Sequence, residues 1–163
     1  MDINEKISEI LKKHVEGKEF FDALDYMVRS DADVLKIYLD FVTSQFESHN
    51  WKRSVGIILT GKFGRALYNN YSEKLYLLTD DIVLVDGDLR KPNTEVETYK
   101  NFFRYAYYIV LDDSIYSGNT VNNIKRGILK TREDVVIPLV YVIYDGSKDI
   151  KNLQIKSLFK YHK

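Results

Sequence analysis

The spacing of apolar residues changes once along the chain, near Trp51. Before that point they recur at three- and four-residue intervals, which is the spacing of one face of a helix. A glycine, Gly17, interrupts the pattern, and the polar residues 30–33 offer a helix N-cap between two further stripes. The pattern therefore predicts two or three helices over residues 3–48.

After Trp51, short continuous apolar runs alternate with helical stripes. Such runs are typical of buried parallel strands. Strands are predicted over residues 54–61, 82–88, 107–113, 135–146 and 154–161. Helices are predicted over residues 62–71, 94–106 and 120–130. A proline, Pro138, weakens the fourth strand or marks a bulge or an edge.

This alternation predicts an α/β fold with a parallel sheet and right-handed crossovers. Ligands of such sheets bind at the carboxyl ends of the strands, near the point where the strand order reverses. Two loops are candidates, one after Thr60 and one after Leu111.

Composition narrows the chemistry. The 163 residues suffice for one domain, and 24 basic residues balance 24 acidic ones, which argues against nucleic-acid binding. The absence of cysteine excludes disulfides and thiol nucleophiles, and the three histidines have no metal-ligand spacing. The first residues are partly acidic and no apolar run is long enough to span a membrane. We expect a cytoplasmic protein without a membrane partner.

The stretch YIVLDDSIYSGNT, residues 108–120, places two adjacent carboxylates, Asp112 and Asp113, at the end of a predicted strand. Two neighbouring acids repel each other, so burying them is costly unless a ligand compensates. A sugar diol or a hydrated divalent cation is such a ligand.

Small and hydroxylated residues follow the acids and open the next predicted helix. Backbone amides at a helix N-terminus, together with the hydroxyls of Ser117 and Thr120, form an anion-binding site. The glycine between them, Gly118, lets the backbone approach an anion closely. The stretch as a whole is suited to a sugar phosphate.

The segment VLDDSIYSGNT resembles the phosphoribosyl-pyrophosphate (PRPP) motif of type I phosphoribosyltransferases. The resemblance implies a type I phosphoribosyltransferase-like fold with a helical N-terminal extension. It also implies that Asp112 and Asp113 act in catalysis, hold the ribose hydroxyls and lie near a bound Mg²⁺. The residues implied to bind the phosphate of PRPP are Ser114, Ile115, Tyr116, Ser117, Gly118, Asn119 and Thr120.

One position departs from the family pattern. Tyr116 stands where the family usually has Thr, Ser, Ala or Asp, and in the hypoxanthine-guanine branch an Asp there is proposed to act on the base. The tyrosine therefore argues against that branch.

The loop after Thr60 permits two interpretations. Gly56, Gly61 and Lys62 match the start of a Walker A loop, but Phe63 stands where Ser or Thr must bind magnesium. The resemblance to phosphoribosyltransferases instead implies a loop that binds pyrophosphate. Its residues are Thr60, Gly61, Lys62, Phe63 and Gly64.

A third segment, DLRKPN over residues 88–93, resembles the basic pair that precedes the pyrophosphate-closing loop in the orotate, adenine and xanthine branches. The resemblance implies that Arg90 contacts pyrophosphate and that Lys91 acts in catalysis. A solvated basic turn is the alternative.

The resemblance covers about residues 52–160 and implies an α/β core over residues 51–163. It leaves residues 1–50 as a helical region that packs on the core or forms the hood over the acceptor base. Tyr144 is a candidate for stacking on that base, whether purine or pyrimidine. Dimers are usual in the family, so a homodimer is expected.

Three hypotheses follow. The first is a Mg²⁺-dependent phosphoribosyltransferase that transfers 5-phosphoribosyl from PRPP to a nitrogenous base and releases pyrophosphate. The second is a non-catalytic sensor on the same fold that binds PRPP or a nucleotide. The third is another α/β enzyme, such as a nucleotide hydrolase.

Overall fold

The predicted alternation of strands and helices is present in a computed structural model, which describes residues 3–13, 18–85, 105–115, 117–129, 134–147, 150 and 153–160. The helices are α1 (Ile3–Lys13), α2 (Lys18–Ser30), α3 (Ala32–Ser48), α4 (Gly61–Tyr76) and α6 (Asn119–Leu129). The strands are β1 (Gly56–Thr60), β2 (Ile82–Val85), β3 (Tyr107–Ile115), β4 (Val136–Asp145) and β5 (Gln154–Lys160). Most of the helix predicted over residues 94–106 lies outside the described residues.

The five strands form one sheet in the order β2-β1-β3-β4-β5, and every described pair is parallel. The predicted α/β class is therefore confirmed. The chain adds β2 on one side of β1 and β3 on the other, so the strand order reverses between β1 and β3. In this strand order, ligands bind at that reversal, outside the carboxyl ends of the two strands.

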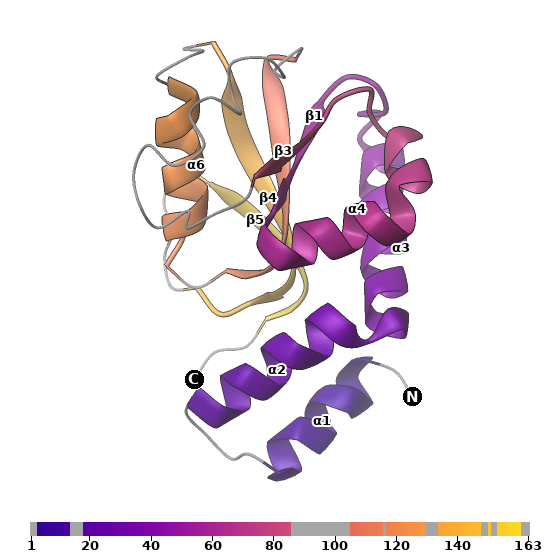
Figure 1. Cartoon of the computed structure of the whole chain (residues 1–163), viewed down its shortest axis with the longest axis vertical. Coiled ribbons are helices and arrows are strands. Elements are labelled where there is room, and N and C mark those ends of the chain that lie inside the picture. Colours follow the sequence, from indigo (N-terminus) through magenta and orange to yellow (C-terminus); the bar gives the residue numbers. More distant parts are fainter. Residues whose placement is uncertain are drawn as a thin grey trace.

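Helices cover both faces of the sheet: α3 and α4 lie on one side and α6 on the other (Figure 1). Side chains of one strand alternate between these layers, so that Ile57 and Leu59 join the α3–α4 core while Ile58 joins the α6 core. Among the described helices, none combines the length and the hydrophobicity that a membrane span requires.

Two of the N-terminal helices, α2 and α3, contact the sheet, while α1 packs on α2. Buried side chains of α3, such as Val34 and Val42, share a core cluster with β1, β3 and β4. The N-cap of α3 is Asp31, whose carboxylate accepts hydrogen bonds from two backbone amides. The same carboxylate forms an ion pair with Lys6 on α1, with an N–O distance of 2.6 Å. Helix α2 contacts β3 and α4, and Figure 1 shows α1 and α2 beyond the carboxyl ends of the strands.

Pro138 accompanies a bulge, as one of the predicted alternatives required. Tyr107 of β3 pairs with Val136 of β4, and the next pair is Ile109 with Leu139. Between these pairs β4 therefore contains one residue more than β3. The edge alternative is wrong, because β4 lies between β3 and β5. Pairing with β5 begins only at Leu139, so the missing amide of Pro138 interrupts no bond to that strand.

A buried contact fixes β1 against β3 at their amino ends. The ring of Tyr108 lies over Gly56, its register partner, and its hydroxyl donates a hydrogen bond to the Asp81 carboxylate. A Cβ atom on residue 56 would lie 2.0 Å from Cε2 of Tyr108, which is too close for any side chain. Glycine at this position is thus a packing requirement.

We therefore predict that Gly56→Ala lowers the free energy of unfolding by about 1–3 kcal/mol, the usual cost of overpacking a core. Urea unfolding followed by circular dichroism measures this loss. In a double-mutant cycle with Tyr108→Leu, the combined loss should be smaller than the sum of the single losses, because the shorter side chain relieves the clash. Strictly additive losses would contradict this account of Gly56.

Candidate active site

The carboxyl ends of β1 and β3 lie side by side at the strand reversal. The last paired residues are Leu59 and Leu111, after which β1 ends at Thr60 and α4 begins at Gly61 without an intervening loop. The two strand ends that the sequence singled out, after Thr60 and after Leu111, are therefore neighbours in space, as the strand-order rule requires. The early start of α4, with Gly56 inside β1, leaves no room for a Walker A loop.

One predicted boundary is wrong. The sequence places the end of β3 at Asp113, but β3 continues to Ile115. The cause is β4, which extends to Asp145 and supplies backbone partners: Asp112 pairs with Val142 and Ile115 with Asp145. The two acids thus lie within a strand that has lost its β1 neighbour, and their backbone is held from the β4 side.

The acids are partly buried and contact each other locally. The Asp113 amide donates a hydrogen bond of 2.8 Å to Oδ1 of Asp112, and the Ser114 hydroxyl lies 3.4 Å from Oδ1 of Asp113. Burial raises the pKa of Asp112 well above its ordinary value, and the charge of Asp113 raises it further. The nearby Thr60 side chain, at the end of β1, opposes this shift.

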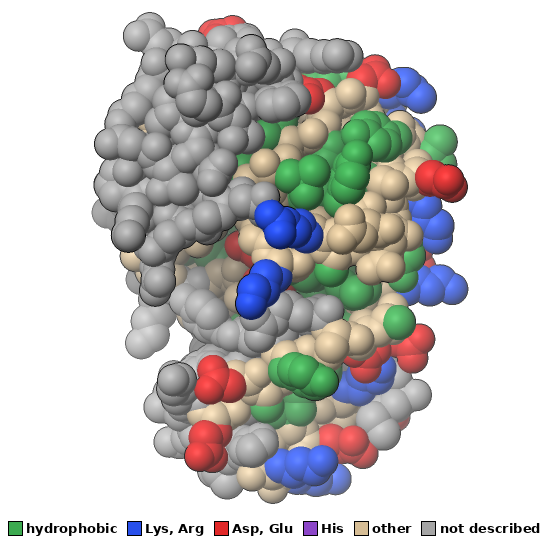
Figure 2. Space-filling model, viewed as in Figure 1, with side chains coloured by type: hydrophobic (Ala, Val, Ile, Leu, Met, Phe, Trp, Pro, Cys, Tyr) green, Lys and Arg blue, Asp and Glu red, His purple; other side chains and the backbone are tan. Residues whose placement is uncertain are grey.

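The start of α4 presents backbone amides at the same place. Gly61 has a left-handed φ of 60°, and no other group lies within 4 Å of where its Cβ would be. The N-cap residue, Thr60, makes no side-chain capping bond. Free amides at a helix N-terminus attract an anion. Figure 2 shows basic side chains at the start of α4, where Lys62 and Arg65 are both exposed.

Phe63 and Gly64, also predicted for pyrophosphate binding, serve the packing of this turn. Phe63 is 2% exposed, and a Cβ on residue 64 would lie 2.7 Å from the carbonyl carbon of Leu59. Gly64 thus lets α4 approach β1 closely. Any contact of these two residues with an anion is limited to the backbone.

The segment after β3 contains a second glycine turn that leads into a helix. Gly118 has a left-handed φ of 80°, and the hydroxyl of Ser117 accepts a hydrogen bond of 3.3 Å from the Asn119 amide. Helix α6 begins at Asn119, one residue before the predicted start, and its N-terminus includes Thr120. Tyr116 lies outside the described residues.

No protein-family model and no curated protein sequence matches the chain. Among solved structures, HGPRT-ase from Leishmania tarentolae, in complex with GMP, matches with a TM-score of 0.53 and 7% identity over 79% of this chain and 75% of that one. The chain has a type I phosphoribosyltransferase fold.

Two further phosphoribosyltransferases match less closely, each with a TM-score of 0.47. The xanthine-guanine-hypoxanthine enzyme of Helicobacter pylori is 10% identical over 81% of this chain and 82% of its own. A hypoxanthine enzyme of Staphylococcus aureus is 12% identical over 78% of this chain and 73% of its own. The match to the Leishmania tarentolae structure confirms the predicted fold, although no family model and no curated sequence matches the chain.

Three further residues were predicted to take part in the site of this phosphoribosyltransferase fold: Arg90, Lys91 and Tyr144. Arg90 and Lys91 lie outside the described residues. Tyr144 is fully buried in the α3–α4 core, so its ring has no exposed face on which a base could stack in this conformation. Stacking by Tyr144 would require the surrounding core to open, and sequence position alone could not reveal that burial.

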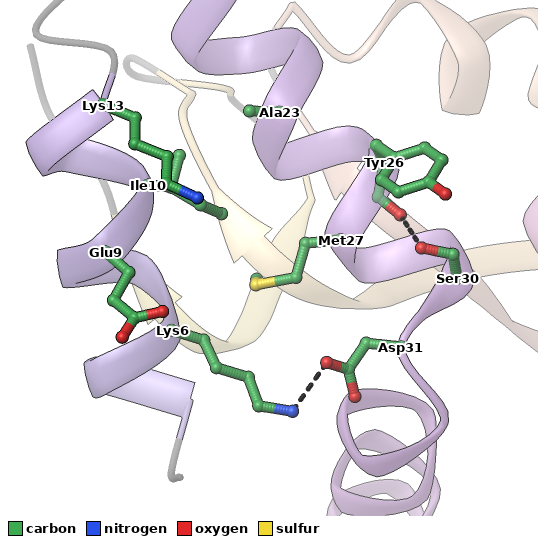
Figure 3. Close-up of a pocket in the computed structure, with 9 residues that line it drawn as sticks. All are labelled: Lys6, Glu9, Ile10, Lys13, Ala23, Tyr26, Met27, Ser30 and Asp31. Carbon is green, nitrogen blue, oxygen red and sulfur yellow. Dashed lines mark hydrogen bonds and ion pairs between the residues drawn. The ribbon is translucent and has the colours of Figure 1, made fainter.

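A cleft of about 580 Å³ lies apart from these loops, between α1 and α2 (Figure 3). Apolar side chains of Ile10 and Met27 lie inside it, and the Lys6–Asp31 ion pair lies at one end. Among the described residues that were predicted to bind PRPP, none lines this cleft.

Asp112 predicts a measurable pH dependence. Its pKa is raised above 3.8 in the folded chain, so the folded state binds its proton more tightly than the unfolded state does. The contribution of Asp112 to stability is complete below the unfolded pKa and is lost as the pH rises through the folded pKa. We therefore expect Asp112→Asn to raise the melting temperature, with a gain that grows as the pH rises above about 4.

Thermal unfolding of both proteins across this pH range measures the effect. Asp40→Asn is the matched control, because Asp40 is an exposed residue of α3 and its replacement should give no growing gain. A constant difference between Asp112→Asn and the original chain over the whole range would contradict the prediction.

Proposed function

We propose that the chain is a phosphoribosyltransferase that transfers the 5-phosphoribosyl group of PRPP to a nitrogen of a base and releases pyrophosphate. The observation that carries the proposal is the position of Asp112 and Asp113. They lie at the strand reversal, beside the start of α4 and a few residues before the Gly118 turn. Two anion-binding turns with a carboxylate pair between them match the three parts of PRPP: pyrophosphate, ribose diol and 5′-phosphate.

The carboxylates of Asp112 and Asp113 would accept hydrogen bonds from the ribose hydroxyls. Burial disfavours the charged form of Asp112 in the free protein. Two hydroxyl donors would compensate for that lost hydration, because hydrogen bonds to an ionised carboxylate are among the stronger ones in proteins. The charged form of Asp112 is thus unfavourable without a ligand and would be favourable with one.

The 5′-phosphate would bind at the α6 N-terminus, on the Gly118 backbone and the hydroxyls of Ser117 and Thr120. The pyrophosphate would bind at the start of α4, on the Gly61 and Lys62 amides and the Lys62 ammonium group. The N-terminal amides of both helices would then contact opposite ends of the same substrate, which fixes the ribose between them.

In the reaction, the bond between C1 of the ribose and the pyrophosphate oxygen breaks, and that oxygen keeps the electron pair. A lone pair of the base nitrogen forms the new bond to C1, and the proton on that nitrogen leaves. Positive charge develops on the ribose ring, and negative charge grows on the departing pyrophosphate. Lys62, with Arg90 and Lys91 from the segment after β2, would stabilise that negative charge.

The donor set fits Mg²⁺. Asp112 and Asp113 supply hard carboxylate oxygens, and in the described part of the chain no group of three or more acidic or histidine residues forms a metal cage. Mg²⁺ in nucleotide enzymes is usually held by one or two carboxylates together with substrate phosphates. Bound there, it would neutralise the charge of the pyrophosphate.

The experiment is an assay of pyrophosphate release from PRPP and Mg²⁺ with a panel of purine and pyrimidine bases. Purines come first, because the matched HGPRT-ase structure is a complex with GMP. Release that depends on one base supports the proposal. PRPP binding without turnover for any base would contradict it in favour of a sensor. Nucleotide hydrolysis without a base and without PRPP affinity would favour a hydrolase.

Asp113→Asn should lower the affinity for PRPP by about tenfold or more, because a neutral amide is a weaker acceptor for the ribose hydroxyls. Calorimetric titration with PRPP and Mg²⁺ measures this. The control is again the exposed Asp40→Asn, which carries the same change of charge on α3 and should bind PRPP normally. Full affinity and turnover in Asp113→Asn would show that the site is placed wrongly.

A further inference from the structure

One side chain of the N-terminal helices reaches the strands that carry the proposed site. Tyr38, on the sheet-facing side of α3, is fully buried. Its hydroxyl donates a buried hydrogen bond of 2.7 Å to the carbonyl oxygen of Tyr141 on β4. Tyr141 is the register partner of Leu111, the residue directly before the two acids. Tyr38 therefore ends beside the segment of β3 that carries the carboxylates.

The same ring contacts the other half of the site. The ring centroids of Tyr38 and Phe63 are 5.4 Å apart at an interplanar angle of 72°, an edge-to-face contact. Phe63 lies in the first turn of α4, directly after Lys62. A shift of the Tyr38 ring would consequently displace Phe63, and with it the backbone amides proposed to bind pyrophosphate.

The acids lie within electrostatic reach of this hydroxyl. Burial raises the pKa of Tyr38, and the charges of Asp112 and Asp113 raise it further. The hydroxyl thus binds the backbone of β4 and lies near both acids of β3. Its own hydrogen goes to a carbonyl oxygen, which leaves the carboxylate oxygens available to a ligand.

We propose that Tyr38 is a positioning residue, which holds the Asp112–Asp113 segment and the first turn of α4 at the separation that PRPP requires. The proposal rests on the proposed phosphoribosyltransferase function. It assigns α3 a part in substrate binding that packing alone does not require. Packing alone does not call for the hydroxyl. Phenylalanine would fill the same space without a polar group that needs a hydrogen bond once it is buried.

The test compares Tyr38→Phe with Val42→Ala. Tyr38→Phe keeps the ring and the contact with Phe63 but removes the hydroxyl. Val42 lies one turn further along α3 and is also fully buried, so its truncation weakens the same helix without touching a polar group. A second variant, Phe63→Leu, removes the ring contact and keeps the hydroxyl.

We expect Tyr38→Phe to weaken PRPP binding in the presence of Mg²⁺ by about tenfold, as loss of a buried hydrogen bond at the site would. The KM for PRPP should rise by a similar factor, while the KM for the base stays unchanged. Phe63→Leu should weaken PRPP binding in the same direction. Val42→Ala should lower the melting temperature at least as much as Tyr38→Phe and leave the affinity for PRPP unchanged.

The outcomes separate the two proposals. If the original chain binds PRPP and Tyr38→Phe binds it equally well, the role of Tyr38 is refuted and the proposed function stands. If Val42→Ala loses as much affinity as Tyr38→Phe, the effect is one of general stability and the role is likewise refuted. If the original chain has no affinity for PRPP, the proposed function fails and the role of Tyr38 fails with it.

Discussion

The parallel pairing of β1 with β3 is the constraint on which the rest of the structure depends. It ends at Leu59 and Leu111, and beyond this point the two strands separate. One turns at once into α4, while the other continues along β4 to Ile115. This divergence creates an edge where helix amides, strand carboxylates and a second helix N-terminus meet. A side chain as large as alanine at Gly56 would already disturb the pairing at its other end.

At that edge, the protein keeps one acid, Asp112, in surroundings that disfavour its charge. Asp112 is held by β4 pairing and by the Asp113 amide, although burial and the neighbouring charge of Asp113 oppose its ionisation. Such an arrangement costs stability in the free protein and is typical of binding sites, where a ligand restores the lost interactions. The left-handed glycines at 61 and 118 lie in the two turns whose backbone would contact PRPP in the proposed function.

The N-terminal helices are joined to this edge. Helix α3 contributes to the same core cluster as the central strands, and α2 contacts β3 and α4. Through Tyr38, α3 touches both β4 and the first turn of α4. The sequence suggested a hood or packing element for residues 1–50. The observed packing of α3 makes part of this region continuous with the sheet, while α1 and α2 lie beyond the strand ends (Figure 1).

The sequence by itself determined the order of elements, the parallel sheet and the two loops at the strand reversal, because periodicity and turn residues act over short distances. It also placed the carboxylate pair and the glycine turn in one continuous motif. Tertiary structure decided the length of β3, which depends on pairing with β4, and the burial of Tyr144, which depends on the core around it. It alone joined Tyr38 to Tyr141, 103 residues later, because contacts between distant segments depend on how whole layers pack.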